Sequence, residues 1–159
     1  MFAIRKAALA AVCVTVIGGG AYAASDWLKG STEDQLKTLA EIQPGLGTVM
    51  IEYSNRYTNM FYAAKGGNWG LADYQLKEAR EIQEVGEMTR PQRAGALKSF
   101  EQSYLDPLGT AIKAKNFKKF EAAFKLGIEG CNGCHAGAGF PFIKYQLPKA
   151  PSSPLVFRQ

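Results

Sequence analysis

The sequence has few side chains of the kinds that bind transition metals. Among its 159 residues there is only one histidine, His135, and there are three cysteines. Cys13 lies in an N-terminal leader, so Cys131 and Cys134 are the two cysteines left in the rest of the chain. A tetrahedral zinc site takes four ligands, usually Cys or His, and only three are present here. This shortage argues against a structural zinc site.

The sequence also lacks the patterns of a β-sheet protein, a repeat protein and a nucleic-acid binder. No useful stretch alternates apolar and polar residues, no internal repeat occurs, and no low-complexity block precedes the C-terminal tail. The formal net charge is +5, and it falls by two when Arg5 and Lys6 of the leader are removed. A mild positive charge spread along the chain does not indicate nucleic-acid binding, but it suits an acidic protein partner.

The first residues have the pattern of a secretory signal peptide. Arg5 and Lys6 precede an apolar run at residues 7–17, and small residues follow at Ala21 and Ala23. The alternative is an uncleaved membrane anchor, but the run is short for a bilayer span and three glycines follow it. We therefore predict a signal peptide over residues 1–23, export to a bacterial periplasm, and no membrane span after cleavage.

The exported part of the sequence begins with two helix signals. Ser31 followed by acidic residues predicts a short helix that ends at about Ile42. Pro44 suits the first turn of the next helix, and the glycine pair at residues 66–67 ends it. The chain therefore enters its longer helices after a short separate one.

Three further segments follow the same logic. Asn68 predicts the cap of a helix that stops before Pro91. Pro107 must kink or restart the next helix, with Asp106 as a new cap. Asn116 caps the last helix, which runs into the region of the two cysteines.

Each long segment carries one apolar stripe at spacings of three and four residues, which predicts one buried face per helix. Such helices with short connections predict an all-α fold, and specifically an antiparallel four-helix bundle over residues 24–147. A proline-rich extended tail is predicted to follow at residues 148–159. The stripe residues are Leu46, Met50, Tyr53, Tyr57, Met60, Ala64, Leu71, Tyr74, Ile82, Val85, Ala94, Leu97, Tyr104, Leu108, Ala111, Phe117, Phe120, Phe124, Ile128 and Cys131.

The sequence CNGCH at residues 131–135 matches the attachment signature of c-type haem. Two thiols three residues apart on one helical face can form thioethers to the two vinyl groups of one porphyrin edge. His135 can then be the proximal iron ligand. A thioredoxin-like redox pair would need a βαβ setting, and a plain disulfide would leave His135 unused. The motif predicts one covalently attached haem c, held by Cys131, Cys134 and His135.

The position of this motif, at the end of the last helix, resembles the class II c-type cytochromes, the group of cytochromes c′ and c-556. The resemblance is specific over residues 114–135, AKNFKKFEAAFKLGIEGCNGCH, and weaker over residues 50–85. It implies a four-helix bundle with haem near its C-terminal end. A homodimer is compatible with it, because dimers are usual in that family.

The sixth iron position separates two interpretations. With one histidine in the chain, bis-histidine ligation is excluded, and Met50, Met60 and Met88 are the methionines available after the leader. In the resembled family the residue over the distal face comes from the first helix, and Met50, 15 residues before Lys65, matches that position. Ordinary core packing is the alternative role for a methionine on a helical stripe.

The leading expectation is therefore a periplasmic one-electron carrier rather than an enzyme, with Met50 as candidate distal ligand and redox proteins as partners. The alternative is a five-coordinate haem that binds a diatomic gas such as nitric oxide. A haem peroxidase is a weaker third, because its distal pocket needs an acid–base group and no second histidine exists. Tyr53, Tyr57 and Phe61 are expected in the core or in the pocket wall.

Two further features bear on the haem surroundings. Lysines precede the motif at positions 113, 115, 118, 119 and 125, and they steer an acidic partner, pair with a haem propionate, or form a solvated helix face. After His135 the sequence AGAGFPF departs from the resembled family and predicts an early helix end. The apolar segment FPFIKYQLP then folds back over the haem edge or docks on another subunit.

Overall fold

The computed structural model describes residues 27–151 and 153–158, and this part of the chain is all-α. It contains no strand, only an isolated bridge between Gly67 and Arg158. None of its helices is both long and apolar enough to cross a membrane. The expected signal peptide, residues 1–23, lies outside the described residues. The chain divides after Ile42 into two compact units.

The described part of the first unit, residues 27–42, contains one short helix, α1 (Thr32–Glu41), and its start is fixed by a reciprocal cap. The Asp34 backbone N–H donates to the Ser31 hydroxyl over 3.2 Å, and the Ser31 backbone N–H donates to the Asp34 carboxylate over 2.9 Å. The Ser31 hydroxyl also donates to the Asp34 carboxylate over 2.6 Å, and this bond together with the one from the Ser31 N–H lowers the pKa of the Asp34 carboxyl. The predicted start at Ser31 and end near Ile42 are confirmed.

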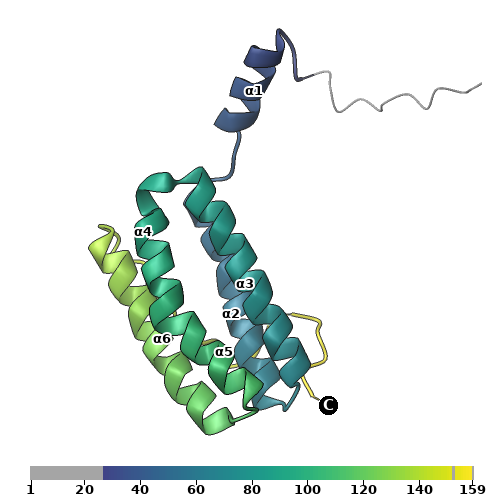
Figure 1. The fold of residues 1–159 in the computed structure, drawn as a ribbon, viewed down its shortest axis with the longest axis vertical. Helices are drawn as coiled ribbons and strands as arrows, with labels where there is room; N and C mark the ends of the chain where they lie inside the picture. The colour runs from purple at the N-terminus through teal and green to yellow at the C-terminus, as the bar shows by residue number, and fades with distance from the viewer. Residues whose placement is uncertain (1–26, 152, 159) are drawn as a thin grey trace, which may run out of the picture. The chain divides into compact units, whose positions relative to one another are not determined.

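The second unit is built from helices joined by short turns (Figure 1). Its elements are α2 (Leu46–Lys65), α3 (Trp69–Thr89), α4 (Pro91–Phe100), the π-helical turn η1 (Glu101–Leu105), α5 (Asp106–Lys113) and α6 (Phe117–Gly137). Residues 91–113 form one continuous helical segment of α4, η1 and α5. Helix α2 packs on α3 and α6, while the α4–η1–α5 segment packs on α3 and α6.

The starts of these helices follow the caps that the sequence predicts, with one correction. The Asn68 side chain accepts from the Leu71 N–H, and the Asn116 side chain accepts from the Lys119 N–H, each over 3.0 Å. Pro44, however, does not lie in the first turn of α2. Gly45 is the N-cap, with extended backbone at φ −63° and ψ 160°, so the proline precedes the helix.

The helical segment around Pro107 does not break: it continues through the π-helical turn η1 into α5, and Asp106 is not the N-cap of α5. A proline has no N–H for the helical hydrogen bond, and the turn before it widens so that the Asp106 N–H donates to the Glu101 carbonyl. Leu105 is the N-cap of α5. The Asp106 carboxylate instead accepts a bond of 2.7 Å from Arg80 of α3, which also pairs with Glu101.

Aromatic rings from α2 and α6 form the centre of the core. Tyr57 and Phe124 stack with centroids 4.3 Å apart and an angle of 19° between their planes. Phe61 packs against Phe124 at 4.9 Å, and Met60 and Phe120 are fully buried beside them. Burial of each such side chain stabilises the fold by about 1.5–3 kcal/mol. This core joins α2 to α6, the helix that carries the CNGCH sequence.

The chain after α6 turns back along the helices. The helix ends at Gly137, two residues after His135, as the AGAGFPF sequence predicts. Gly139 has φ +91°, a backbone conformation that favours glycine, and it reverses the chain direction. We call residues 138–148 the return segment. Its last residue, Pro148, accepts a bond of 2.6 Å from the Tyr62 hydroxyl of α2.

The described residues of the C-terminal tail, 149–151 and 153–158, lead to the end of α2. Phe157 lies beside Tyr62, with ring centroids 6.1 Å apart. The Phe157 carbonyl crosses Gly66 so closely that a Cβ on this glycine would lie 2.2 Å from the oxygen. The Gly66–Gly67 pair that ends α2 therefore also leaves room for the tail.

Candidate functional site

The last two turns of α6 carry both cysteines and the histidine. Cys131 and Cys134 are free thiols separated by three residues, so they lie on the same side of the helix. Cys131 packs against the core cluster, and this burial raises the pKa of its thiol to about 12. The motif is thus helical, with its two sulfur atoms unpaired and available to a ligand. The plain disulfide considered from the sequence is not formed.

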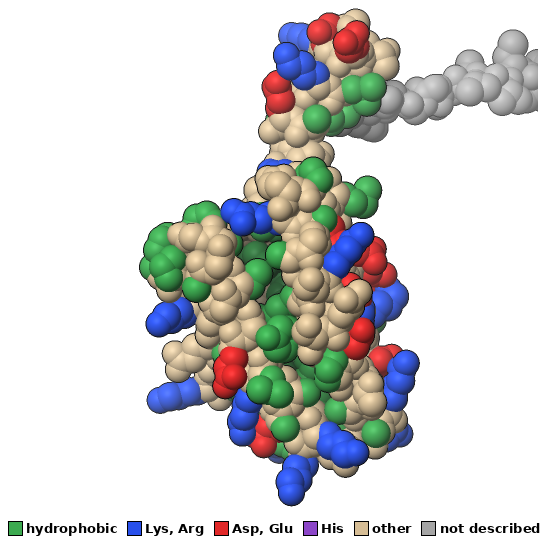
Figure 2. Space-filling view, turned by 60° about the vertical axis from the view of Figure 1, so that its left-hand side comes forward, with side chains coloured by type: hydrophobic (Ala, Val, Ile, Leu, Met, Phe, Trp, Pro, Cys, Tyr) green, Lys and Arg blue, Asp and Glu red, His purple; other side chains and the backbone are tan. Residues whose placement is uncertain are grey.

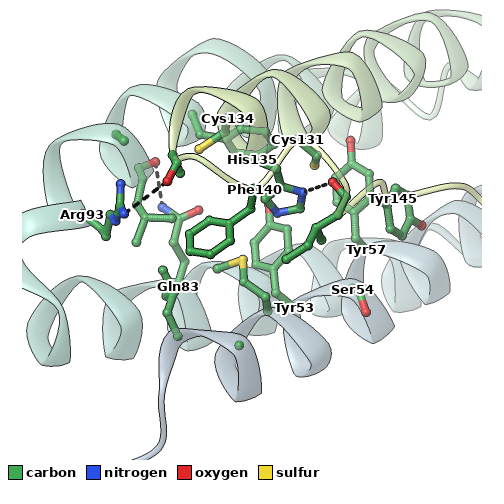
Figure 3. A pocket seen from close by; sticks show the side chains of 18 of the residues that line it. Tyr53, Ser54, Tyr57, Gln83, Arg93, Cys131, Cys134, His135, Phe140 and Tyr145 are labelled. Atoms are coloured by element: carbon green, nitrogen blue, oxygen red, sulfur yellow. Dashed lines mark hydrogen bonds between the residues drawn. The ribbon is translucent and has the colours of Figure 1, made fainter.

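His135 is fixed by the return segment. Its Nδ1 lies 3.0 Å from the Ile143 carbonyl oxygen (Figure 3). A carbonyl oxygen can only accept a hydrogen bond, so Nδ1 carries the proton and donates it. The neutral ring then keeps a lone pair on Nε2, which is the atom free to bind a metal. Metal-binding histidines in proteins are commonly held in this way by a second hydrogen bond.

These residues line a large cavity between the helices and the return segment. Its volume is about 800 Å³, within the range of about 300–1,000 Å³ that is usual for small-molecule sites. Its walls come from α2, α3, α4, α6 and the return segment, and they are mostly apolar. Figure 2 shows the hydrophobic side chains gathered around a hollow on one face. No aspartate or glutamate lines the cavity.

Among the methionines of the described residues, Met50 is the one that lines this cavity together with the cysteines and histidine. It lies on the first turns of α2 and lines the cavity wall together with Leu46, so these two members of the predicted stripe leave the core. Met60 is fully buried in the core, while Met88 is 81% exposed on α3. Neither Met60 nor Met88 lines the cavity. The structure therefore brings Met50 together with His135, and it separates the other two methionines from the site.

Tyrosine rings on α2 form one wall of the cavity. Tyr53 and Tyr57 stack at 6.0 Å with 15° between their planes, and both line the cavity as predicted, whereas Phe61 lies in the core. The Tyr57 hydroxyl donates to the Phe124 carbonyl over 3.3 Å. The Tyr53 hydroxyl is buried and has no hydrogen-bond partner in the protein. Burial raises the pKa of Tyr53, so its hydroxyl is a neutral donor that a bound group or water could satisfy.

Two cations at this cavity are residues that the sequence did not single out. Arg93 of α4 lines it, and its Nη2 lies 3.5 Å from the Ala138 carbonyl in the return segment. Lys144 lines it from the return segment itself. None of the five lysines that precede the motif, at positions 113–125, lines the cavity. Nothing in the sequence indicates that Arg93, some 40 residues before the motif, lies at the cavity. Lys144 could have been found, because it lies within the segment FPFIKYQLP that was expected near the haem edge.

Gln83 is a third side chain that sequence reasoning missed. It is 1% exposed, it lines the cavity from α3, and its amide donates to the Leu97 carbonyl over 3.1 Å. This bond ties α3 to α4 behind the cavity. A glutamine in the largely charged stretch REIQEVGE has nothing in the sequence that indicates its burial.

The described residues contain no group of three or more His, Cys, Asp or Glu side chains arranged to hold a metal ion.

Comparison with known proteins finds no matching family model, no similar curated protein and no similar solved structure. The function of the site is therefore inferred from its own residues and geometry.

Proposed function

We propose that the protein is an exported monohaem c-type cytochrome that carries single electrons. Its second unit is then an antiparallel four-helix bundle with the haem on its last helix, similar to the class II cytochromes. The observation that carries the proposal is the common cavity: Cys131, Cys134 and His135 from α6 line it together with Met50 from α2.

The residues around the cavity fit a haem group. An apolar cavity of about 800 Å³ suits a large flat macrocycle, and the tyrosine wall offers aromatic surface to it. Each cysteine thiol would add across one vinyl double bond, with a carbon–sulfur bond formed, the π bond broken and the thiol hydrogen transferred to the neighbouring vinyl carbon. This addition needs two free thiols, and both cysteines are free.

Two side chains from different helices would ligate the haem iron. His135 offers Nε2 because its Nδ1 proton is engaged by Ile143. Met50 offers its thioether from the facing wall, and methionine ligation raises the reduction potential relative to stronger donors. The bound haem supplies the one-electron redox chemistry, while the protein sets the potential, access and partner choice.

The charged ends of the haem also find partners in this cavity. Arg93 and Lys144 are the two cations on its wall, and no carboxylate competes for them. Because a haem carries two propionate groups, these cations would pair with them. The predicted signal peptide and the positive charge of the chain favour a periplasmic role with an acidic redox partner.

An absorption spectrum of the ferrous protein, with and without carbon monoxide, tests the ligation. The unmutated protein should be low-spin and should bind carbon monoxide slowly, because Met50 occupies the sixth position. Met50→Leu should become high-spin and bind the gas rapidly, whereas the control Met60→Leu should keep the low-spin spectrum. Rapid binding by the unmutated protein, unchanged in Met50→Leu, would contradict this ligand and favour a gas-binding haem.

A further inference from the structure

The side chain of Asn132, inside the CNGCH sequence, binds the backbone of the return segment at two points. Its Oδ1 accepts a bond of 2.8 Å from the Tyr145 N–H, and its Nδ2 donates a bond of 3.2 Å to the Tyr145 carbonyl. Only an amide side chain offers a donor and an acceptor in this arrangement. Asn132 therefore fixes one residue of the return segment in both position and direction.

Two residues before this contact, the same segment binds His135. The Ile143 carbonyl accepts from His135 Nδ1 over 3.0 Å. The Phe140 N–H donates to the His135 carbonyl over 2.8 Å, and the Ile143 N–H donates to the Phe140 carbonyl over 3.0 Å. The segment thus forms a closed turn over the histidine, and Asn132 holds the far end of that turn.

The turn itself makes few contacts beyond these. Its residues 139–144 are exposed, with Phe142 at 78% and Ile143 at 47%. The Tyr145 side chain is held separately, because its hydroxyl bonds the Thr58 hydroxyl over 2.9 Å and its ring packs against Tyr57. Asn132 is the side chain that bonds the Tyr145 backbone, two residues after the Ile143 carbonyl that accepts from the histidine.

We propose that Asn132 is a positioning residue for the proximal ligand: it anchors the return segment so that the Ile143 carbonyl keeps His135 in the Nδ1-protonated form with Nε2 directed at the iron. The inference rests on the proposed function, because it assumes that His135 binds haem iron. A residue between the two cysteines thereby acts on the third member of the motif through Tyr145, which lies 13 residues further along the chain. Hydrogen bonding to the second nitrogen also raises the basicity of a metal-bound histidine.

The test compares haem-loaded forms of the unmutated protein, Asn132→Ala and Tyr145→Phe. Exchange of the His135 Nδ1 proton and of the Tyr145 amide proton is followed by NMR in the diamagnetic ferrous state. In Asn132→Ala both protons should exchange at least about tenfold faster, the change expected when a pair of hydrogen bonds is lost. Tyr145→Phe loses only the bond to Thr58, so its His135 Nδ1 proton should exchange as in the unmutated protein.

A purely structural role for Asn132 would give a different result. Both variants would then lose stability in denaturant, and neither would change the exchange of the His135 Nδ1 proton. If the Asn132→Ala protein cannot be produced in folded form, Asn132→Asp is used in its place. Its carboxylate can still accept from the Tyr145 N–H but cannot donate to the Tyr145 carbonyl. This variant should show an intermediate exchange rate at Nδ1, and a rate equal to that of the unmutated protein overturns the proposal.

The same samples separate this inference from the proposed function. If the unmutated protein carries no haem when it is produced with a c-type maturation system, the proposed function fails before Asn132 is tested. If it carries haem and the Nδ1 proton of Asn132→Ala exchanges at the unmutated rate, the cytochrome assignment stands and the role of Asn132 is rejected.

Discussion

Gly127 of α6 lies directly against the hydroxyl of Tyr57 on α2: a Cβ on Gly127 would come 2.0 Å from that oxygen. The close approach lets the hydroxyl reach the Phe124 carbonyl. A similar contact follows one turn later, where a Cβ on Gly130 would lie 2.4 Å from the Tyr104 ring. Two glycines thus bring aromatic rings against the helix face that leads to Cys131.

Gly127→Ala is expected to destabilise the fold by about 1–3 kcal/mol, because the added methyl group overpacks the contact and displaces Tyr57. The change is measured as a shift of the denaturation midpoint in urea. The matched control is Gly95→Ala in α4, where a Cβ would meet nothing within 4 Å. That control should gain up to about 1 kcal/mol from helix propensity. Equal effects of the two substitutions would contradict the described contact.

Gly66→Ala is expected to release the C-terminal tail, since its Cβ would lie 2.2 Å from the Phe157 carbonyl oxygen. Hydrogen exchange over residues 153–158 should become faster while the exchange of α6 stays unchanged. Gly70→Ala is the control, because its Cβ would meet only the Asn68 side chain, at 4.0 Å. Faster tail exchange in the control alone would argue that the tail does not cross Gly66.

Stability is expected to fall as the pH rises above 10. Burial raises the pKa of Tyr145 from 10 to about 12, with the bond to Thr58 opposing the rise, and burial raises the pKa of Tyr53 and of Tyr57 as well. A folded state that holds these protons more tightly than the unfolded state loses stability as the pH rises from 10 towards 12. Thermal unfolding followed from pH 8 to 12 measures this.

Tyr145→Phe should make the loss of stability at alkaline pH less steep, because one of the three tyrosines with a raised pKa is gone while Tyr53 and Tyr57 remain. A variant whose pH profile from 8 to 12 matches that of the unmutated protein would show that Tyr145 does not contribute.

Arg93→Gln is expected to lower the reduction potential of the haem protein, because a positive charge at the cavity wall favours the reduced iron over the oxidised one. A change of about 1 kcal/mol, on the order of tens of millivolts, is reasonable for a partly buried charge. Lys118→Gln removes an equal charge from outside the cavity wall, where solvent screens it. Spectroelectrochemical titration compares the variants, and equal shifts would contradict a special role for Arg93.

The sequence predicted the helices well because their ends are encoded locally. Ser31, Asn68 and Asn116 each cap a helix through a side chain that bonds a backbone N–H three residues later. Asp106 was assigned a similar role and does not have it, because its carboxylate bonds Arg80, which is 26 residues away in the sequence. Helix-capping patterns in the sequence cannot reveal Arg80 as the partner of Asp106, because only the packing of α3 on α5 brings the two side chains together.

The candidate site was predicted in part for the same reason. Cys131, Cys134 and His135 form one local motif and are found together on α6. Arg93 was missed because only the fold brings α4 to the return segment. Met50 stands between these cases: the resemblance to class II cytochromes picked it out and it lines the cavity, while its role as an iron ligand stays a prediction. The bonds from Asn132 to Tyr145 had no sequence signal, since nothing marks residues 13 apart as partners.

The mass of the intact protein, purified after export in cells with a c-type maturation system, tests the central claim most directly. The account predicts the mature chain plus one haem, with the colour retained in the protein after acid–acetone extraction, and loss of this covalent haem in the double variant Cys131→Ser and Cys134→Ser. A mass equal to the bare chain, or a haem that is extracted by the solvent, would contradict it.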